Sequence, residues 1–163
     1  MKKIELQLAM DGAATRTLDQ AMEIIDRVAP YLDIIEIGTS FVLRYGMEPV
    51  SRVKAAHPDK KILADMKVMD GGYHNCGLGF KAGGDIVTVL GVSDHGTIQN
   101  ATKAAHDYGK QIMVDLICVK DVAETIAFCE EIGTDYICVH TGVDMQAQGK
   151  DPLDALKEAL ALV

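Results

Sequence analysis

Short apolar runs alternate with amphipathic stretches along the whole chain of 163 residues. The apolar runs are rich in Ile and Val, as in strands that are buried on both faces of a parallel sheet. The stretches between them have apolar residues at helical spacing. The pattern predicts strands over 4–10, 33–38, 61–66, 85–90, 111–117 and 135–140, and helices over 17–29, 48–56, 72–82, 94–108, 121–132 and 152–162. Six strand–helix units in series with short connections predict an α/β fold with a parallel sheet.

Capping residues support several of these boundaries. Thr17 is a suitable N-cap for the first helix, and Pro30 stops that helix. Gly109 and Gly133 follow the fourth and fifth long helical patterns, where a C′ glycine closes a helix. No interdomain linker stands out, so we expect a single domain over residues 1–163.

Composition limits the partners of the protein. The net charge of −8 argues against non-specific nucleic-acid binding and against a basic membrane-binding patch. No apolar run approaches the roughly 20 residues of a membrane span, and the N-terminus enters a strand pattern without a cleavable signal. The four cysteines have no CxxC spacing, and Cys118 and Cys138 lie in predicted strands. We therefore expect reduced, mostly buried thiols in a cytoplasmic protein.

Three charges follow the third apolar run. Asp65, Lys67 and Asp70 come at the end of this strand and are followed by paired glycines. Alternate strand residues point to the same face, so Asp65 and Lys67 should project together, with Asp70 in the following loop. Taken alone, Asp65 and Lys67 could also be a solvated ion pair.

Similar polar residues occur where other predicted strands end. The carboxyl ends of parallel strands meet at one edge, which is where α/β barrels and open sheets build their sites. This agreement among strands predicts a site formed by Asp11, Glu36, Asp65 with Lys67, Asp115 and His140.

These motifs resemble the orotidine-monophosphate decarboxylase superfamily. The resemblance is carried by D-x-K-x-x-D at 65–70 after Leu-Ala, by Ile-Ile-Glu-Ile-Gly-Thr at 34–39 and by Leu-Ala-Met-Asp at 8–11. Within the superfamily, the chain is similar to the branch of 3-hexulose-6-phosphate synthase and 3-keto-L-gulonate-6-phosphate decarboxylase. The decarboxylase typically has an arginine where this chain has Val143 and a glutamate where it has Asp115, so the synthase is favoured.

The resemblance implies a TIM-barrel fold with eight β/α units. The chain contains six of the eight, which predicts an incomplete barrel lacking the last two units. In the family, those units carry the glycine-rich backbone that binds the substrate phosphate. A truncated, inactive remnant is therefore a further alternative to the synthase and the decarboxylase.

The resemblance also implies roles for the site residues. The synthase joins formaldehyde to D-ribulose 5-phosphate through a 1,2-enediolate with the help of Mg²⁺. Glu36 and Asp65 would bind Mg²⁺, and Lys67, held charged between Asp65 and Asp70, would donate to the enediolate.

His140 would be the base that moves the C1 proton, because its ordinary pKa lies near the working pH. Asp70 would reach the active site of a neighbouring subunit, which implies a homodimer. Asp11 and Asp115 would bind substrate or support the other residues. The purely structural alternatives are a turn residue for Asp11, a hydrogen-bonding role for Asp115 and a core or loop position for His140.

Overall fold

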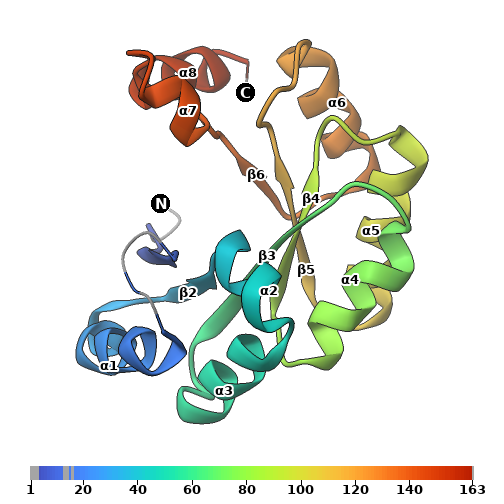
Figure 1. Cartoon of the computed structure of the whole chain (residues 1–163). Helices are drawn as coiled ribbons and strands as arrows, with labels where there is room; N and C mark the ends of the chain where they lie inside the picture. The colour runs from blue at the N-terminus through green and yellow to red at the C-terminus, as the bar shows by residue number, and fades with distance from the viewer. Residues whose placement is uncertain (1–3, 13–14, 16, 163) are drawn as a thin grey trace.

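Six parallel strands form one curled sheet in the computed structural model, which describes residues 4–12, 15 and 17–162. The strand order follows the sequence, and each strand pairs in parallel with the next. Figure 1 shows the sheet as an open arc, a half-barrel. The strands are β1 (Gln7–Met10), β2 (Ile34–Ile37), β3 (Lys61–Val68), β4 (Ile86–Leu90), β5 (Gln111–Asp115) and β6 (Tyr136–Cys138).

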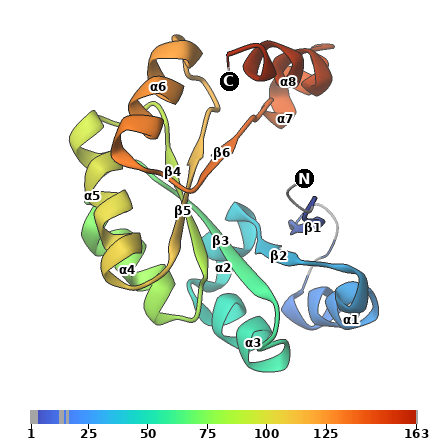
Figure 2. The same ribbon diagram turned by 180° about the vertical axis from the view of Figure 1, so that it is seen from behind.

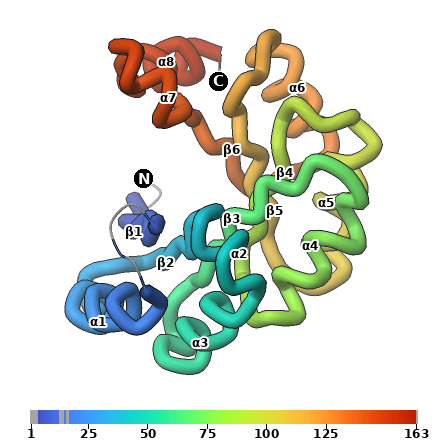
Figure 3. The backbone as a smooth tube through the Cα atoms, viewed as in Figure 1, coloured from blue at the N-terminus to red at the C-terminus, as the bar shows by residue number. Residues whose placement is uncertain are grey.

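The helices between the strands cover the outside of the arc, and two further helices follow the last strand (Figure 2). They are α1 (Leu18–Val28), the 3₁₀ helix η1 (Ala29–Tyr31), α2 (Thr39–Tyr45), α3 (Glu48–Ala56), α4 (Gly72–Lys81), α5 (His95–Asp107), α6 (Val122–Ile132), α7 (Val143–Gln146) and α8 (Pro152–Leu160). The tube in Figure 3 follows this arc from β1 to β6, with α7 and α8 beyond β6. Within the described residues, no helix is both long enough and apolar enough to cross a membrane.

The predicted parallel α/β half-barrel is confirmed, and several predicted boundaries hold. Helix α3 spans the predicted residues, and the hydroxyl of Thr17 caps α1 by accepting a hydrogen bond of 3.2 Å from the backbone N–H of Gln20. The glycine at 133 adopts the left-handed backbone that closes α6, with φ of 74°.

Other predicted boundaries were wrong. Helices α2 and α7 were expected as connecting segments, and β5 and β6 end earlier than the apolar pattern suggested. Cys118 therefore lies outside β5, exposed and with φ of 61°, instead of in a buried strand. Strand β3, in contrast, continues to Val68, two residues beyond its predicted end.

The sheet has a different apolar layer on each face. Side chains such as Ile35, Ala64 and Val87 pack outward against the helices in the main core. The inner face carries a smaller cluster, formed by Ile34, Leu63, Ile86 and Met113 with Tyr136 and Cys138 packed against it. Because strand side chains alternate, each of the strands β2 to β6 contributes to both layers.

Three aspartates hold the amino-terminal edge of the sheet in register. Asp33, Asp85 and Asp135 each stand just before an even-numbered strand. Their carboxylates accept hydrogen bonds of 2.9–3.0 Å from the backbone N–H groups of Leu6, Ile62 and Ile112 at the start of the preceding strand. The contact recurs every two β/α units, a repeat that sequence inspection alone did not reveal.

A polar cluster joins the two ends of the arc at the amino-terminal edge of the sheet. Lys61 of β3 donates hydrogen bonds to Glu5 Oε1 at 2.9 Å and to the Tyr136 hydroxyl of β6 at 3.0 Å. The Tyr136 hydroxyl in turn donates to Glu5 Oε2 at 3.2 Å. Residues 131 positions apart in the sequence are thereby linked, which helps to fix the curl of the sheet.

Asp85 offers a test of the edge contacts. Burial raises the pKa of its carboxyl, but hydrogen bonds from Lys110, Lys54 and the Ile62 N–H outweigh burial and hold the pKa below its ordinary value. Asp85→Asn should lower the free energy of unfolding at pH 7 by about 1.5–3 kcal/mol, because two charged donors lose an ionised acceptor. Urea denaturation of the wild type and the variant measures this difference.

The pH dependence of the Asp85 effect has a defined sign. A lowered pKa gives stability that is present above the unfolded pKa of about 4 and is lost as the pH falls through the folded value. The wild type and Asp85→Asn should therefore converge below about pH 4. The control Asp19→Asn, in an ion pair whose Asp side chain is 81% exposed, should change stability little. Equal stability of Asp85→Asn and the wild type at pH 7 would show that the contacts of the Asp85 carboxylate do not stabilise the fold.

Candidate active site

A polar layer lies directly beyond the inner apolar layer, at the carboxyl ends of the strands. The inward-facing apolar residues of β2 to β6 are Ile34, Leu63, Ile86, Met113 and Tyr136. Two positions further along the same strands, and hence on the same face, are Glu36, Asp65, Thr88, Asp115 and Cys138. The fold thus presents one polar side chain from each of five neighbouring strands to the inside of the half-barrel.

Asp65 and Lys67 meet through a bulge in β3. The pairing register of β3 with β4 shifts between Ala64 and Val68, and Lys67 has a positive φ of 44°. The backbone N–H of Lys67 donates to Thr88 Oγ1 at 2.9 Å, and Lys67 Nζ donates to Asp65 Oδ2 at 2.6 Å. The two side chains come together as the sequence predicts, but the bulge, and not regular alternation, directs the lysine.

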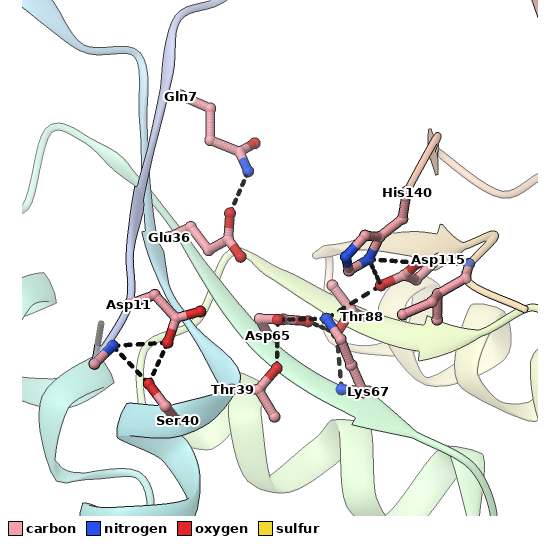
Figure 4. Close-up of polar contacts among 12 residues, drawn as sticks. Gln7, Asp11, Glu36, Thr39, Ser40, Asp65, Lys67, Thr88, Asp115 and His140 are labelled. Carbon is pink, nitrogen blue, oxygen red and sulfur yellow. Dashed lines mark hydrogen bonds and ion pairs between the residues drawn. The ribbon is translucent and has the colours of Figure 1, made fainter. Parts of the chain in front are cut away.

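Two threonine hydroxyls hold the Asp65 carboxylate. Thr39, at the start of α2, donates to Oδ2 at 2.6 Å, and Thr88 of β4 donates to Oδ1 at 2.8 Å (Figure 4). Asp65 is 5% exposed, so these bonds replace the water that its charge has lost. Sequence reasoning missed both threonines as site residues. The available signal was a lone hydroxyl in the otherwise apolar strand that contains Thr88.

Asp115 bridges Lys67 and His140. Its Oδ2 lies 3.1 Å from Lys67 Nζ and 2.8 Å from His140 Nδ1, while its Oδ1 accepts from the Ile117 N–H at 2.9 Å. Figure 4 shows this chain of contacts running from β3 to His140, two residues past the end of β6. Asp115 is only 2% exposed, which suits a residue that positions its neighbours better than one that binds substrate directly.

Within one chain, the second carboxylate beside Lys67 is therefore Asp115, and Asp70 of the same chain does not contact Lys67. Asp70 is exposed, and its Oδ1 accepts from the Gly71 N–H at 2.7 Å. Its carbonyl oxygen accepts from Asn75 Nδ2 at 2.8 Å. The loop following β3 turns Asp70 away toward the start of α4, where it lines a shallow pocket with residues of α5.

The contacts among Lys67, Asp115 and His140 shift the pKa of each of these groups. Burial lowers the pKa of Lys67, but the hydrogen bond to Asp65 and the charges of Asp65 and Asp115 outweigh it, so the pKa lies above its ordinary value. The hydrogen bond to Asp115 raises the pKa of His140. Burial raises the pKa of Asp115, yet the bonds from His140 and the Ile117 N–H leave it below its ordinary value. Lys67 is thus a cation and Asp115 an anion near neutral pH.

Glu36 and Asp11 stand on the other side of Asp65. Glu36 Oε2 accepts from Gln7 Nε2 at 2.6 Å, and Gln7 was not identified from the sequence. Burial, followed by the charge of Asp65, raises the pKa of Glu36. Asp11 accepts from the Gly12 N–H at 2.7 Å and from the hydroxyl of Ser40. These contacts link the end of β1 to Ser40 of α2, and Asp11 lies on the same side of Asp65 as Glu36 (Figure 4).

Glu36 and Asp65 fit the requirements of a Mg²⁺ ion. Mg²⁺ binds carboxylate oxygens and retains several waters, so two protein carboxylates suffice. Burial, followed by the charge of Asp65, raises the pKa of Glu36, so the two carboxylates lie near enough to interact and both offer oxygen ligands to a cation. Asp65 already accepts three hydrogen bonds, and a carboxylate offers about four lone-pair sites, so one remains for a cation.

The fold and the site define the class of this protein. Residues 5–161 match the family described as "Orotidine 5'-phosphate decarboxylase / HUMPS family". The chain belongs to this family, as its motifs indicated.

Three known proteins show which members of the family it is similar to. The chain is 42% identical over 153 residues to 3-hexulose-6-phosphate synthase of Bacillus subtilis, covering 94% of this chain and 71% of that protein. The crystal structure of 3-hexulose-6-phosphate synthase from Salmonella typhimurium superposes with a TM-score of 0.92 at 46% identity, covering 98% of this chain and 74% of that one. The 3-keto-L-gulonate-6-phosphate decarboxylase of Vibrio cholerae gives 0.81 at 28% identity, with 99% and 75% covered. The relatives are lyases, which supports an enzyme.

The contact between Asp115 and His140 predicts a measurable change in the protonation of the imidazole. Asp115→Asn removes the negative charge that raises the pKa of His140, so His140 should lose its proton at a lower pH than in the wild type. NMR titration of the imidazole nitrogens, with His140→Gln to assign the signal, measures both values. Asp59→Asn, a change at an exposed position, is the control and should leave the titration in place. An unchanged His140 titration in Asp115→Asn would show that the contact does not set its pKa.

Proposed function

We propose that the protein is a 3-hexulose-6-phosphate synthase-like aldehyde-lyase that condenses formaldehyde with D-ribulose 5-phosphate in the presence of Mg²⁺. The observation that carries the proposal is the connected set Asp65–Lys67–Asp115–His140 at the carboxyl edge of the strands, with Glu36 beside it. The names of relatives that are 38–46% identical support the same activity.

The first step is removal of the C1 proton of ribulose 5-phosphate. His140 is suited to take this proton because its Nδ1 is held by Asp115, which orients the ring and increases its basicity. Proton loss places negative charge on two cis oxygens of a 1,2-enediolate. The Lys67 ammonium, fixed between Asp65 and Asp115, is placed to donate to one of them. A Mg²⁺ ion bound by Glu36 and Asp65 would supply further positive charge to these oxygens.

The second step forms the carbon–carbon bond. C1 of the enediolate attacks the carbonyl carbon of formaldehyde, the C2 carbonyl is restored, and the electron pair of the formaldehyde double bond moves to its oxygen. That oxygen takes a proton, which protonated His140 is suited to donate. The product is a 3-hexulose 6-phosphate.

The decarboxylase of the same branch is the second candidate, because its structures share the fold at 26–28% identity. Three residues after His140, where that enzyme is expected to carry an arginine, this chain has Val143. Val143 is the first residue of α7 and is 77% exposed. Val143 offers no positive charge to a substrate carboxylate. We therefore favour the synthase, and CO₂ release from 3-keto-L-gulonate 6-phosphate separates the two.

We further propose that the protein acts as a cytoplasmic homodimer with the site near the subunit interface. The argument is the position of Asp70, which is exposed at the start of α4 and directed away from Lys67 of its own chain. An exposed carboxylate beside the α4–α5 surface is suitably placed to reach a second copy.

Replacement of Lys67 tests the role of the ammonium. Lys67→Ala should reduce formaldehyde-dependent consumption of ribulose 5-phosphate by about 10²–10³-fold, because a charge-stabilising donor is lost from the enediolate. The assay is run with Mg²⁺ and repeated with a chelator, which should abolish turnover. The surface variant Lys103→Ala, whose side chain is 62% exposed, should keep wild-type turnover. Wild-type rates in Lys67→Ala would refute the assigned role.

Replacement of His140 tests proton removal separately from carbon–carbon bond formation. In D₂O without formaldehyde, the enzyme should exchange a C1 proton of ribulose 5-phosphate for deuterium, which NMR detects directly. His140→Gln should slow this exchange by about 10²–10⁴-fold, the usual contribution of a general base. His106→Gln, at an exposed position on α5, is the matched control. Undiminished exchange in His140→Gln would assign the base to another group.

A further inference from the structure

One member of the polar layer has no role in the proposed reaction. Cys138 of β6 pairs in register with Asp115 of β5, and its side chain packs against the inner apolar cluster. It therefore occupies in β6 the position that Asp115, Thr88, Asp65 and Glu36 occupy in the other strands. The sequence predicted Cys138 to be a reduced, buried thiol in a strand.

The Cys138 sulfur lies beside two other metal-binding side chains. One ligand atom each of Asp115, Cys138 and His140 lie within 4.8 Å of one another. Usual zinc bond lengths place the ligands of a tetrahedral site roughly 3.3–3.8 Å apart. His140 Nδ1 and Asp115 Oδ2 are already 2.8 Å apart, and Cys138 and His140 are both half-buried.

The chemistry of this group differs from that of the Mg²⁺ pair. Thiolate and imidazole are the donors that select zinc and similar ions, whereas Mg²⁺ prefers oxygen alone. The charged side chains that act on the thiol include Asp115, Glu36 and Asp65 as well as Lys67, and carboxylates beside the thiol favour binding of a divalent cation. Burial, followed by the charges of Asp115 and Glu36, raises the pKa of the Cys138 thiol to about 12, so the thiol is protonated when no metal is bound.

We propose that Asp115, Cys138 and His140 form a binding site for one thiophilic divalent metal ion, such as Zn²⁺. The ion binds the thiolate sulfur, one imidazole nitrogen and one carboxylate oxygen, and the thiol proton leaves to solvent. A fourth position remains for water. The site is separate from the carboxylate pair Glu36 and Asp65.

Metal binding here has a consequence that rests on the proposed function. The ion takes the imidazole of His140, the proposed base, and the carboxylate of Asp115 that holds Lys67. Zn²⁺ should therefore inhibit the condensation even when Mg²⁺ is saturating. Removal of the thiol should weaken this inhibition, expressed as the ratio of activities with and without Zn²⁺ in each variant.

Cobalt absorption tests the site without any activity measurement. Co²⁺ added to the full chain should give a thiolate-to-cobalt charge-transfer band in the near ultraviolet, which Zn²⁺ abolishes by displacement. Cys138→Ser should lose the band completely. Cys118→Ser, which removes an exposed thiol in the segment after β5, is the matched control and should retain the band. Glu36→Gln should also retain the band, because it alters only the carboxylate pair.

The outcomes are distinguishable. A band that persists in Cys138→Ser, that disappears in Cys118→Ser, or that is absent from the wild type would overturn the proposed metal site. Circular dichroism of each variant confirms that the fold is intact, and Cys138→Ala provides a second variant with the same expected loss. Zinc affinity in Cys138→Ser should fall by about 10-fold or more. A band in a protein that does not consume ribulose 5-phosphate would support the metal site and refute the proposed function.

Discussion

The buried carboxylate of Asp65 is the charge on which the geometry of the site depends. An ionised carboxylate that is 5% exposed persists only when hydrogen bonds and a nearby cation replace its hydration. Thr39, Thr88 and Lys67 fulfil this requirement, and each reaches Asp65 from a different segment of the chain. Thr88 also accepts from the Lys67 backbone, so the same hydroxyl secures the bulge that directs the lysine. Asp65 therefore determines where the ammonium lies before any substrate is present.

The half-barrel supports this site because its inward-facing side chains change in character along the strands. Inward positions change from a polar cluster at the amino-terminal edge, to an apolar layer in the middle, to the polar layer of the site. Lys61, Leu63 and Asp65 of β3 show this sequence within five residues. The aspartates at 33, 85 and 135 fix the register of neighbouring strands at the opposite edge. Because a shift of one residue would turn every inward side chain outward, these remote contacts protect the site as well as the fold.

The fold and most site residues could be predicted because both follow from local patterns. Buried parallel strands show as apolar runs, and a charge at the end of such a run is conspicuous, as with Asp65 or Glu36. The partners of those charges were harder to predict, because they depend on contacts between strands. Thr88 resembles any β-branched strand residue, and the contact between Lys67 and Asp115 follows from the bulge. A bulge changes side-chain direction without leaving a mark in the hydrophobic pattern.

Asp115 couples the two groups that the proposed chemistry needs in opposite states. Lys67 must be charged to stabilise an enediolate, whereas His140 must be neutral to accept a proton. The carboxylate stabilises the cation at Lys67 and raises the pKa of His140, while the charge on Lys67 acts in the opposite direction on the imidazole. The three groups therefore titrate as a set, and a change at one alters the other two. Because Lys67 and His140 share the Asp115 carboxylate, a metal ion bound at Cys138 would disrupt the contacts of both at once.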